Sequence, residues 1–225
     1  MALRSLILFF FFVSTTMLNA QNSKTGNWFI YFGNQAISKK WNWHNELQYR
    51  NYNFAGDLQQ LMLRTGFGYN LTEKNNNVLL GYGFIRSENY VGNSDIKLVS
   101  EEHRVFEQYI HKHSLGRVFF QHRVRVEERF LKNKFEMRGR YFLGINIPIN
   151  KSTLDKGAIY ASLYNEVFLN FQNTVFDRNR AYAALGYVIH KNLKVEVGFM
   201  AQTLKNTNRN QFQIVVFNNF PFRND

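Results

Sequence analysis

Alternation of charged and apolar residues is the dominant pattern in the second half of the chain. It is clearest in residues 117–131, with polar Gln121, Arg123, Arg125, Glu127 and Arg129 in one phase and apolar Phe120, Val124, Val126 and Phe130 in the other. Successive side chains of a β-strand point to opposite faces, so this segment has one charged face and one apolar face. In a soluble sandwich the charged face would meet water. In an outer-membrane barrel it would line the interior, and the apolar face would meet lipid.

The same two-residue period predicts about eleven strands in a single antiparallel meander. They are expected at residues 28–35, 41–50, 60–71, 78–87, 101–111, 117–131, 135–147, 159–169, 180–189, 195–202 and 211–220. Bacterial single-chain barrels have an even number of strands. We therefore expect ten, with 28–35 incomplete, or twelve, with one more strand in a longer loop. The polar stretch 88–100 is expected to be a surface loop.

Strand length and the kind of charge on the polar face favour the membrane barrel. Most of the expected strands are longer than the five or six residues usual in soluble sheets and match the 9–11 that cross a bilayer with tilt. Their polar faces are rich in arginine, whose planar fork suits defined pairing with carboxylates. Alternation alone leaves open a lipocalin-like barrel with an apolar interior. The predicted fold is all-β, an antiparallel up-and-down transmembrane β-barrel of 10–12 strands.

The first twenty residues have the order of a secretory signal peptide. Arg4 precedes the apolar run 6–13, and Ala20 supplies a small residue before Gln21. We expect residues 1–20 to be a cleavable signal peptide and 21–225 to form one barrel domain in a bacterial outer membrane. The chain has no cysteine, so neither a disulfide nor a thiol-linked lipid anchor is expected.

The formal charge of +12 raises the question of a polyanionic partner. The basic residues alternate with apolar residues inside the expected strands instead of clustering in a run or on a helix face. This pattern argues against nucleic acid and leaves outer-membrane lipid and small anionic solutes as the expected partners.

Several charged segments resemble the DUF2490 family of outer-membrane barrels from Gram-negative bacteria. The resemblance covers essentially the whole chain after residue 20. It lies in Trp28, Lys39–Trp41, Glu46–Arg50, Glu102–Arg104, His122–Phe130, Arg138–Tyr141, Glu166 and Phe176–Arg180. It implies a β-barrel in the outer membrane and no particular activity.

Sequence motifs for catalysis, cofactor binding or metal binding are absent. There is no Gly-x-Ser-x-Gly elbow, phosphate-binding glycine loop or zinc signature, so no catalytic, cofactor or metal residue is assigned. His111 and His113 are expected to be exposed histidines near a turn, and His103 and His122 likewise. A lipid-modifying enzyme that uses His122 and Ser114 is an alternative without an identifiable oxyanion site. We expect the protein not to be an enzyme.

The remaining candidate is a polar network in the barrel interior. Its expected members are Glu46, Arg50, Arg64, Arg123, Arg125, Glu127, Arg129, Glu136, Arg138, Arg140, Glu166, Arg180 and Glu196. A barrel of this size is only slightly wider than the eight-stranded kind that side chains fill, so we expect a salt-bridged interior with a structural role. The alternative is a narrow pore that prefers anions, because arginine outnumbers the acids.

Overall fold

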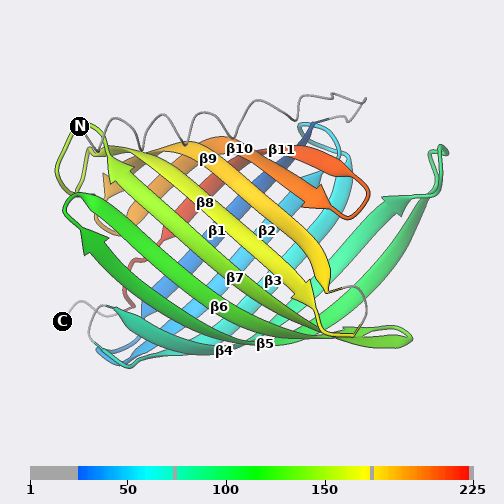
Figure 1. The fold of residues 1–225 in the computed structure, drawn as a ribbon, viewed down its shortest axis with the longest axis horizontal. Coiled ribbons are helices and arrows are strands. Elements are labelled where there is room, and N and C mark those ends of the chain that lie inside the picture. The colour runs from blue at the N-terminus through cyan, green and yellow to red at the C-terminus, as the bar shows by residue number, and fades with distance from the viewer. Residues whose placement is uncertain (1–24, 73–74, 173–174, 223–225) are drawn as a thin grey trace.

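A computed structural model describes residues 25–72, 75–172 and 175–222, so the predicted signal peptide lies outside the described residues. The described residues form eleven strands and no helix with the length and hydropathy of a membrane span (Figure 1). The strands are β1 (Gly26–Ala36), β2 (Trp41–Asn51), β3 (Leu58–Asn70), β4 (Asn76–Tyr90), β5 (Lys97–Leu115), β6 (Val118–Leu131), β7 (Lys134–Pro148), β8 (Ile159–Asn170), β9 (Phe176–His190), β10 (Leu193–Leu204) and β11 (Asn208–Asn218).

The sheet closes on itself, and the all-β barrel of 10–12 strands predicted from the sequence is confirmed. Each strand pairs antiparallel with its sequence neighbours, and β1 pairs with β11 in parallel, from Gly26 opposite Gln211 to Gly33 opposite Asn218. Eleven strands contain ten reversals of direction, and an even number of reversals leaves the first and last strands pointing the same way, which requires a parallel closing pair. The expectation of an even number was therefore wrong within the described residues, and β1 is a complete strand paired on both sides.

The predicted loop at 88–100 is also corrected, because most of it is strand. β4 and β5 stay paired as far as Tyr90 and Lys97, and this hairpin projects beyond the barrel wall (Figure 1). The Lys97 ammonium forms a 2.7 Å ion pair with Asp57 in the β2–β3 loop, and this carboxylate raises the pKa of Lys97. The Tyr90 ring packs on Tyr52. These contacts tie the hairpin to the neighbouring loop.

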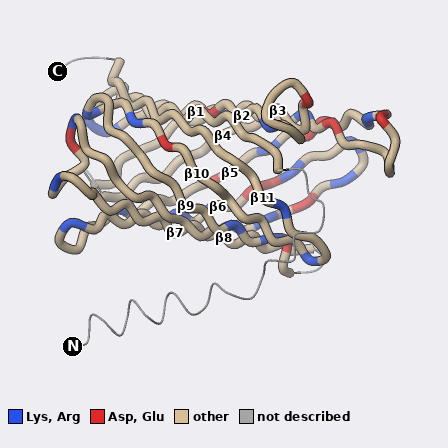
Figure 2. The backbone as a smooth tube through the Cα atoms, turned by 90° about the horizontal axis from the view of Figure 1, so that it is seen from above, with Lys and Arg blue, Asp and Glu red and all other residues tan. Residues whose placement is uncertain are grey.

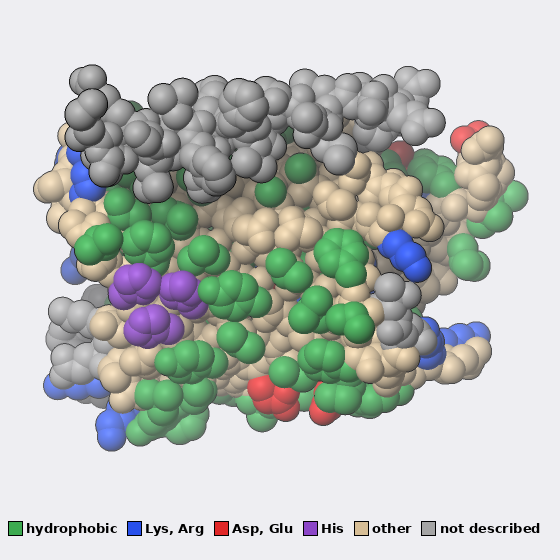
Figure 3. All heavy atoms as spheres, in the orientation of Figure 1, with side chains coloured by type: hydrophobic (Ala, Val, Ile, Leu, Met, Phe, Trp, Pro, Cys, Tyr) green, Lys and Arg blue, Asp and Glu red, His purple; other side chains and the backbone are tan. Residues whose placement is uncertain are grey.

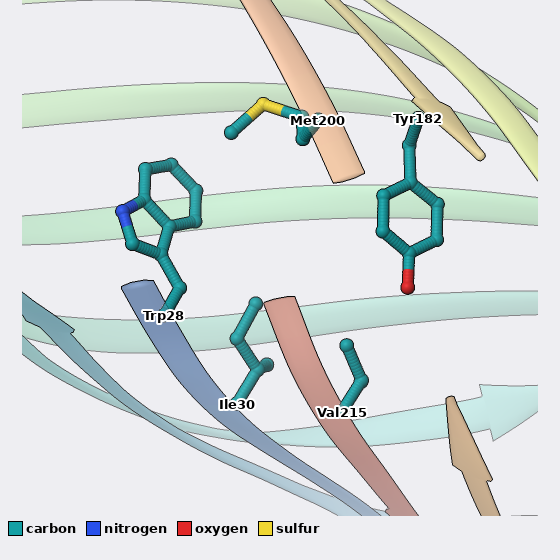
Figure 4. Packing of buried hydrophobic residues seen from close by; sticks show 5 residues of the cluster. All are labelled: Trp28, Ile30, Tyr182, Met200 and Val215. Carbon is teal, nitrogen blue, oxygen red and sulfur yellow. The ribbon is translucent and has the colours of Figure 1, made fainter. Parts of the chain in front are cut away.

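Side chains in the barrel interior divide into two kinds. An apolar cluster covers the closing seam and β9–β10, and consists of Trp28, Ile30, Tyr182, Met200 and Val215 (Figure 4). Most of the buried charged residues lie on β2, β3 and β5–β8, with Arg180 on β9 and Glu196 on β10, and charged positions are interspersed along the strands (Figure 2). The Phe106 ring lies inside against Gly81, where a Cβ atom would overlap the ring. Glycine at this position therefore makes room for a bulky neighbour.

The outer face of the barrel is largely apolar (Figure 3). Mid-strand side chains such as Leu80, Leu185 and Phe199 are about 60% exposed, at 59%, 62% and 61%. Several polar groups on this face bond to one another: the Trp43 indole donates to Thr65 at 2.8 Å, the Asn165 and Asn179 amides bond reciprocally at 3.0 Å, and the Tyr82 hydroxyl lies 2.5 Å from His103 Nδ1. Two carboxylates, Glu107 and Glu128, also stand on this face.

Candidate functional site

Glu127 on β6 is the centre of the charged interior. Its side chain is fully buried, and Arg138 and Arg140 on β7 each donate to it at 2.5 Å. Three further guanidinium groups approach the same carboxylate at 3.6–3.7 Å, those of Arg64, Arg104 and Arg125. Because Arg64 comes from β3, three strands away from β6, the Glu127 contacts cross the barrel interior.

Two other carboxylates extend this set toward β2 and β8. Glu46 on β2 accepts from Arg64 at 2.7 Å, and Glu166 on β8 accepts from Arg123 and Arg140, both at 2.7 Å. Arg64 and Arg140 therefore each bridge two glutamates. The result is a continuous chain of ion pairs that joins β2, β3, β6, β7 and β8.

A second branch runs along β5, β6 and β7 toward the end that carries the projecting hairpin, here called the hairpin end. Glu102 lies 2.6 Å from both Arg104 and Arg129, and Arg129 also binds Glu136 at 2.6 Å. Arg138 reaches Asp177 on β9 at 3.0 Å. We call the whole set the ion-pair network: Glu46, Arg64, Glu102, Arg104, Arg123, Arg125, Glu127, Arg129, Glu136, Arg138, Arg140, Glu166 and Asp177.

Three members of this network were missed from the sequence, namely Glu102, Arg104 and Asp177. Arg104 lies in the same phase of its strand as Gln108, and Glu102 is two residues before it. The strand phase could therefore have included both. Asp177 had no such signal, because the expected strand began only at residue 180.

Two arginines expected in the network lie inside the barrel but form no ion pair with a described residue. Arg50 donates to Gln60 at 2.6 Å and lies 3.8 Å above the Trp28 ring. Arg180 donates to Gln202 at 2.8 Å and faces the same indole at 5.0 Å. Both guanidinium groups thus rely on amide oxygens and on a cation–π contact.

Glu196 on β10 is likewise inside the barrel and apart from the ion pairs. The Tyr160 hydroxyl donates to it at 2.9 Å, and the Tyr182 hydroxyl lies 3.4 Å away. It therefore contacts the apolar cluster at the seam through Tyr182, and it forms no ion pair with a guanidinium group among the described residues.

A cavity of about 320 Å³ lies between the charged wall and the seam. It reaches the end of the barrel opposite the hairpin, which we call the asparagine rim because its lining there includes Asn34, Asn70, Asn75, Asn76 and Asn146. Its inner part is lined by Glu46, Arg64, Arg123, Arg125, Arg140 and Glu166. The ion-pair network therefore forms the floor of the cavity and continues from there toward the hairpin end.

Three of the histidines that were expected to be exposed lie outside this interior. His111, His113 and His122 stack on the outer face with ring centroids 5.2–6.1 Å apart (Figure 3). Within the described ranges no group of three or more metal-ligating side chains is arranged to hold a metal ion. Ser114 falls in the inward phase of β5 whereas His122 faces outward and bonds Tyr141 at 2.9 Å, so the structure does not bring Ser114 and His122 together.

Comparison with known proteins places this barrel in a family. No curated protein and no solved structure matches the chain. The family described as "Protein of unknown function (DUF2490)" matches residues 25–213, which include every strand from β1 to β10 and all of the ion-pair network. The chain therefore belongs to the DUF2490 family.

Proposed function

We propose that this protein is an integral outer-membrane β-barrel whose interior is closed by the ion-pair network, so that it serves as a sealed barrel and not as an open pore. The observation that carries this proposal is the burial of Glu127 beneath arginines from β3, β5, β6 and β7. Side chains from distant strands meet at one carboxylate in the middle of the barrel.

The membrane location is supported by the outer face. Exposed apolar side chains such as Leu80 and Leu185 cover the middle of the strands, which would expose a large apolar patch in a soluble protein. The mutual bonds between outward polar groups, such as the Asn165–Asn179 pair, satisfy donors and acceptors where water is absent. Glu107 and Glu128 are exceptions, and carboxylates cost less than arginine or lysine on a lipid face.

Closure is supported by the geometry of the ion pairs. Bidentate and bridging arginines have fixed planar forks, and most of the ion pairs here join different strands. Removing such groups from water is costly unless their partners stay in place. A path for ions through this section would require several of these contacts to separate together.

The alternative, a narrow anion-preferring pore, is favoured by one observation. The cavity is lined by seven lysines and arginines and three glutamates, an excess of four positive charges among the described residues. Such a lining would select anions if the floor opened.

Planar-bilayer recording distinguishes the sealed barrel from the anion-preferring pore. We expect wild-type protein to give no defined single-channel steps even at high protein load, because the network occupies the interior. Defined steps with an anion-selective reversal potential under a salt gradient, and a loss of that selectivity in Arg125→Ala or Arg138→Ala, would contradict the sealed barrel and establish the pore.

A further inference from the structure

The cavity at the asparagine rim has more positive charge than its own carboxylates can balance. Its three glutamates already have partners: Glu46 binds Arg64, Glu166 binds Arg123, and Glu196 accepts from Tyr160. Arg64, Arg125 and Arg140 also pair with Glu127, which lies outside the cavity lining, so an excess of three positive charges remains at the cavity.

Several buried donors at the cavity wall have no hydrogen-bond partner among the described residues. They are Arg64 Nε, Arg123 Nε, Arg125 Nη1, Trp28 Nε1 and Gln213 Nε2, and all five residues line the cavity. Arg64 and Arg125 are only 6% and 1% exposed. A buried donor left unsatisfied costs about 1–3 kcal/mol, so the residues that line the cavity retain hydrogen-bonding capacity that their described neighbours do not use.

Two lysines on different walls line the outer part of the cavity. They are Lys112 on β5 and Lys194 on β10, and Glu196, two residues from Lys194 on β10, offsets part of the Lys194 charge. Neither forms an ion pair with a described residue, and Lys194 instead lies 5.2 Å from the Phe217 ring. Two like charges held on different walls repel each other, and an anion between them would relieve this repulsion.

Flat apolar surface lies beside these cations, because the Phe217 ring is 5.2 Å from Lys194 and the Phe142 ring is 4.6 Å from Arg123. Phe32 and Phe217 stack with ring centroids 5.4 Å apart across the closing seam, and Phe142 and Tyr164 pack at 5.1 Å. All four rings line the cavity. A ligand that matches this lining has an anionic group at one end and an apolar or ring-shaped body at the other.

We propose that this cavity binds a small organic anion, with its carboxylate or phosphate group held by Lys112, Lys194 and Arg123 and its body packed against the aromatic wall. The volume of about 320 Å³ lies at the lower end of the range for small-molecule sites, roughly 300–1,000 Å³. This goes beyond the proposed function, because a barrel sealed at its floor can still bind a ligand at its open end.

The proposal is tested by calorimetric titration of the folded, detergent-solubilised protein with phenyl phosphate, benzoate, inorganic phosphate and benzyl alcohol. We expect phenyl phosphate or benzoate to bind at least tenfold more tightly than inorganic phosphate and benzyl alcohol, with affinity that falls as salt rises. The double variant Lys112→Gln/Lys194→Gln should weaken binding at least tenfold. The double variant Lys39→Gln/Lys40→Gln removes the same charge from the β1–β2 turn, outside the cavity lining, and should bind as the wild type does.

Three results would overturn the site. The first is that folded wild-type protein binds neither organic anion. The second is that the wild type and the Lys112/Lys194 variant bind with equal affinity. The third is that both double variants lose the same amount of affinity. Inorganic phosphate bound as tightly as phenyl phosphate would overturn the role of the aromatic wall. Tighter binding of phenyl phosphate would identify the ligand group as a phosphate, and tighter binding of benzoate would identify it as a carboxylate. Channel steps in planar bilayers would contradict the sealed barrel alone, so the two proposals fail separately.

Discussion

Replacement of Glu127 by glutamine is expected to lower the free energy of unfolding by about 3–5 kcal/mol, the loss typical of removing one partner from a buried ion pair. The Glu127 carboxylate is the shared partner of Arg138 and Arg140, and three more guanidinium groups lie within 3.7 Å. Glutamine keeps the shape but removes the negative charge, so these buried arginines would repel one another. Urea titration of protein refolded in vesicles, followed by tryptophan fluorescence, measures the change.

Glu88→Gln is the matched control for this substitution. Glu88 lies on the projecting hairpin, 3.1 Å from Arg86, whose side chain is 45% exposed. Exposed ion pairs contribute about 0–1 kcal/mol, so the control should lose no more than that. A loss for Glu127→Gln as small as for the control would show that the ion-pair network does not hold the barrel together.

Leu185→Arg is expected to destabilise the membrane-inserted protein by about 2–4 kcal/mol, the cost of arginine at the bilayer midplane of a barrel. Leu185 lies in the middle of β9, is 62% exposed, and is flanked on the outer face by Val197 of β10 and Ala161 of β8. If the same face met water, an exposed arginine would change stability by only about 0.5 kcal/mol. The same urea titration in vesicles measures the difference.

The depth dependence of this cost provides the control. Ile189 is on the same face of β9 but close to its end at the asparagine rim. Ile189→Arg should cost about 0–1 kcal/mol, as arginine does near an interface. Equal small effects at Leu185 and Ile189 would mean that the outer face is not immersed in lipid.

The period of two predicted most of the fold because one-sided burial fixes the face of each strand. It located all eleven strands, including β1, whose residues Trp28, Ile30 and Phe32 lie inside although they are apolar. The expectation of ten or twelve strands was wrong because a parallel pair between the first and last strands lets an odd number of strands close the barrel. Closure depends on the pairing of β1 with β11, a contact between the two ends of the chain that no local pattern encodes.

The interior was predictable in its members but not in its arrangement. Phase along the strands predicts Arg125, Glu127 and Arg138 on the interior face, and the structure places Arg125 and Arg138 against Glu127. It could not show that Arg50 lies against an aromatic ring and not a carboxylate. That contact depends on the register between β1 and β2, which places Arg50 opposite Trp28. The cavity could not be predicted either, because it depends on which interior side chains near the rim are too small to fill the space between the walls.

The central claim is that the outer face of this barrel lies in lipid, and contact with lipid tests it most directly. The chain has no cysteine, so single cysteines at Leu80, Leu185, Lys39 and Lys132 can each carry one fluorescent label. In vesicles that contain lipids brominated in the acyl chain, we predict strong quenching for the labels at Leu80 and Leu185, on the middle of the outer face, and weak quenching at the two lysines in the turns. Equally weak quenching at all four positions, in protein shown to be folded, would contradict the membrane barrel.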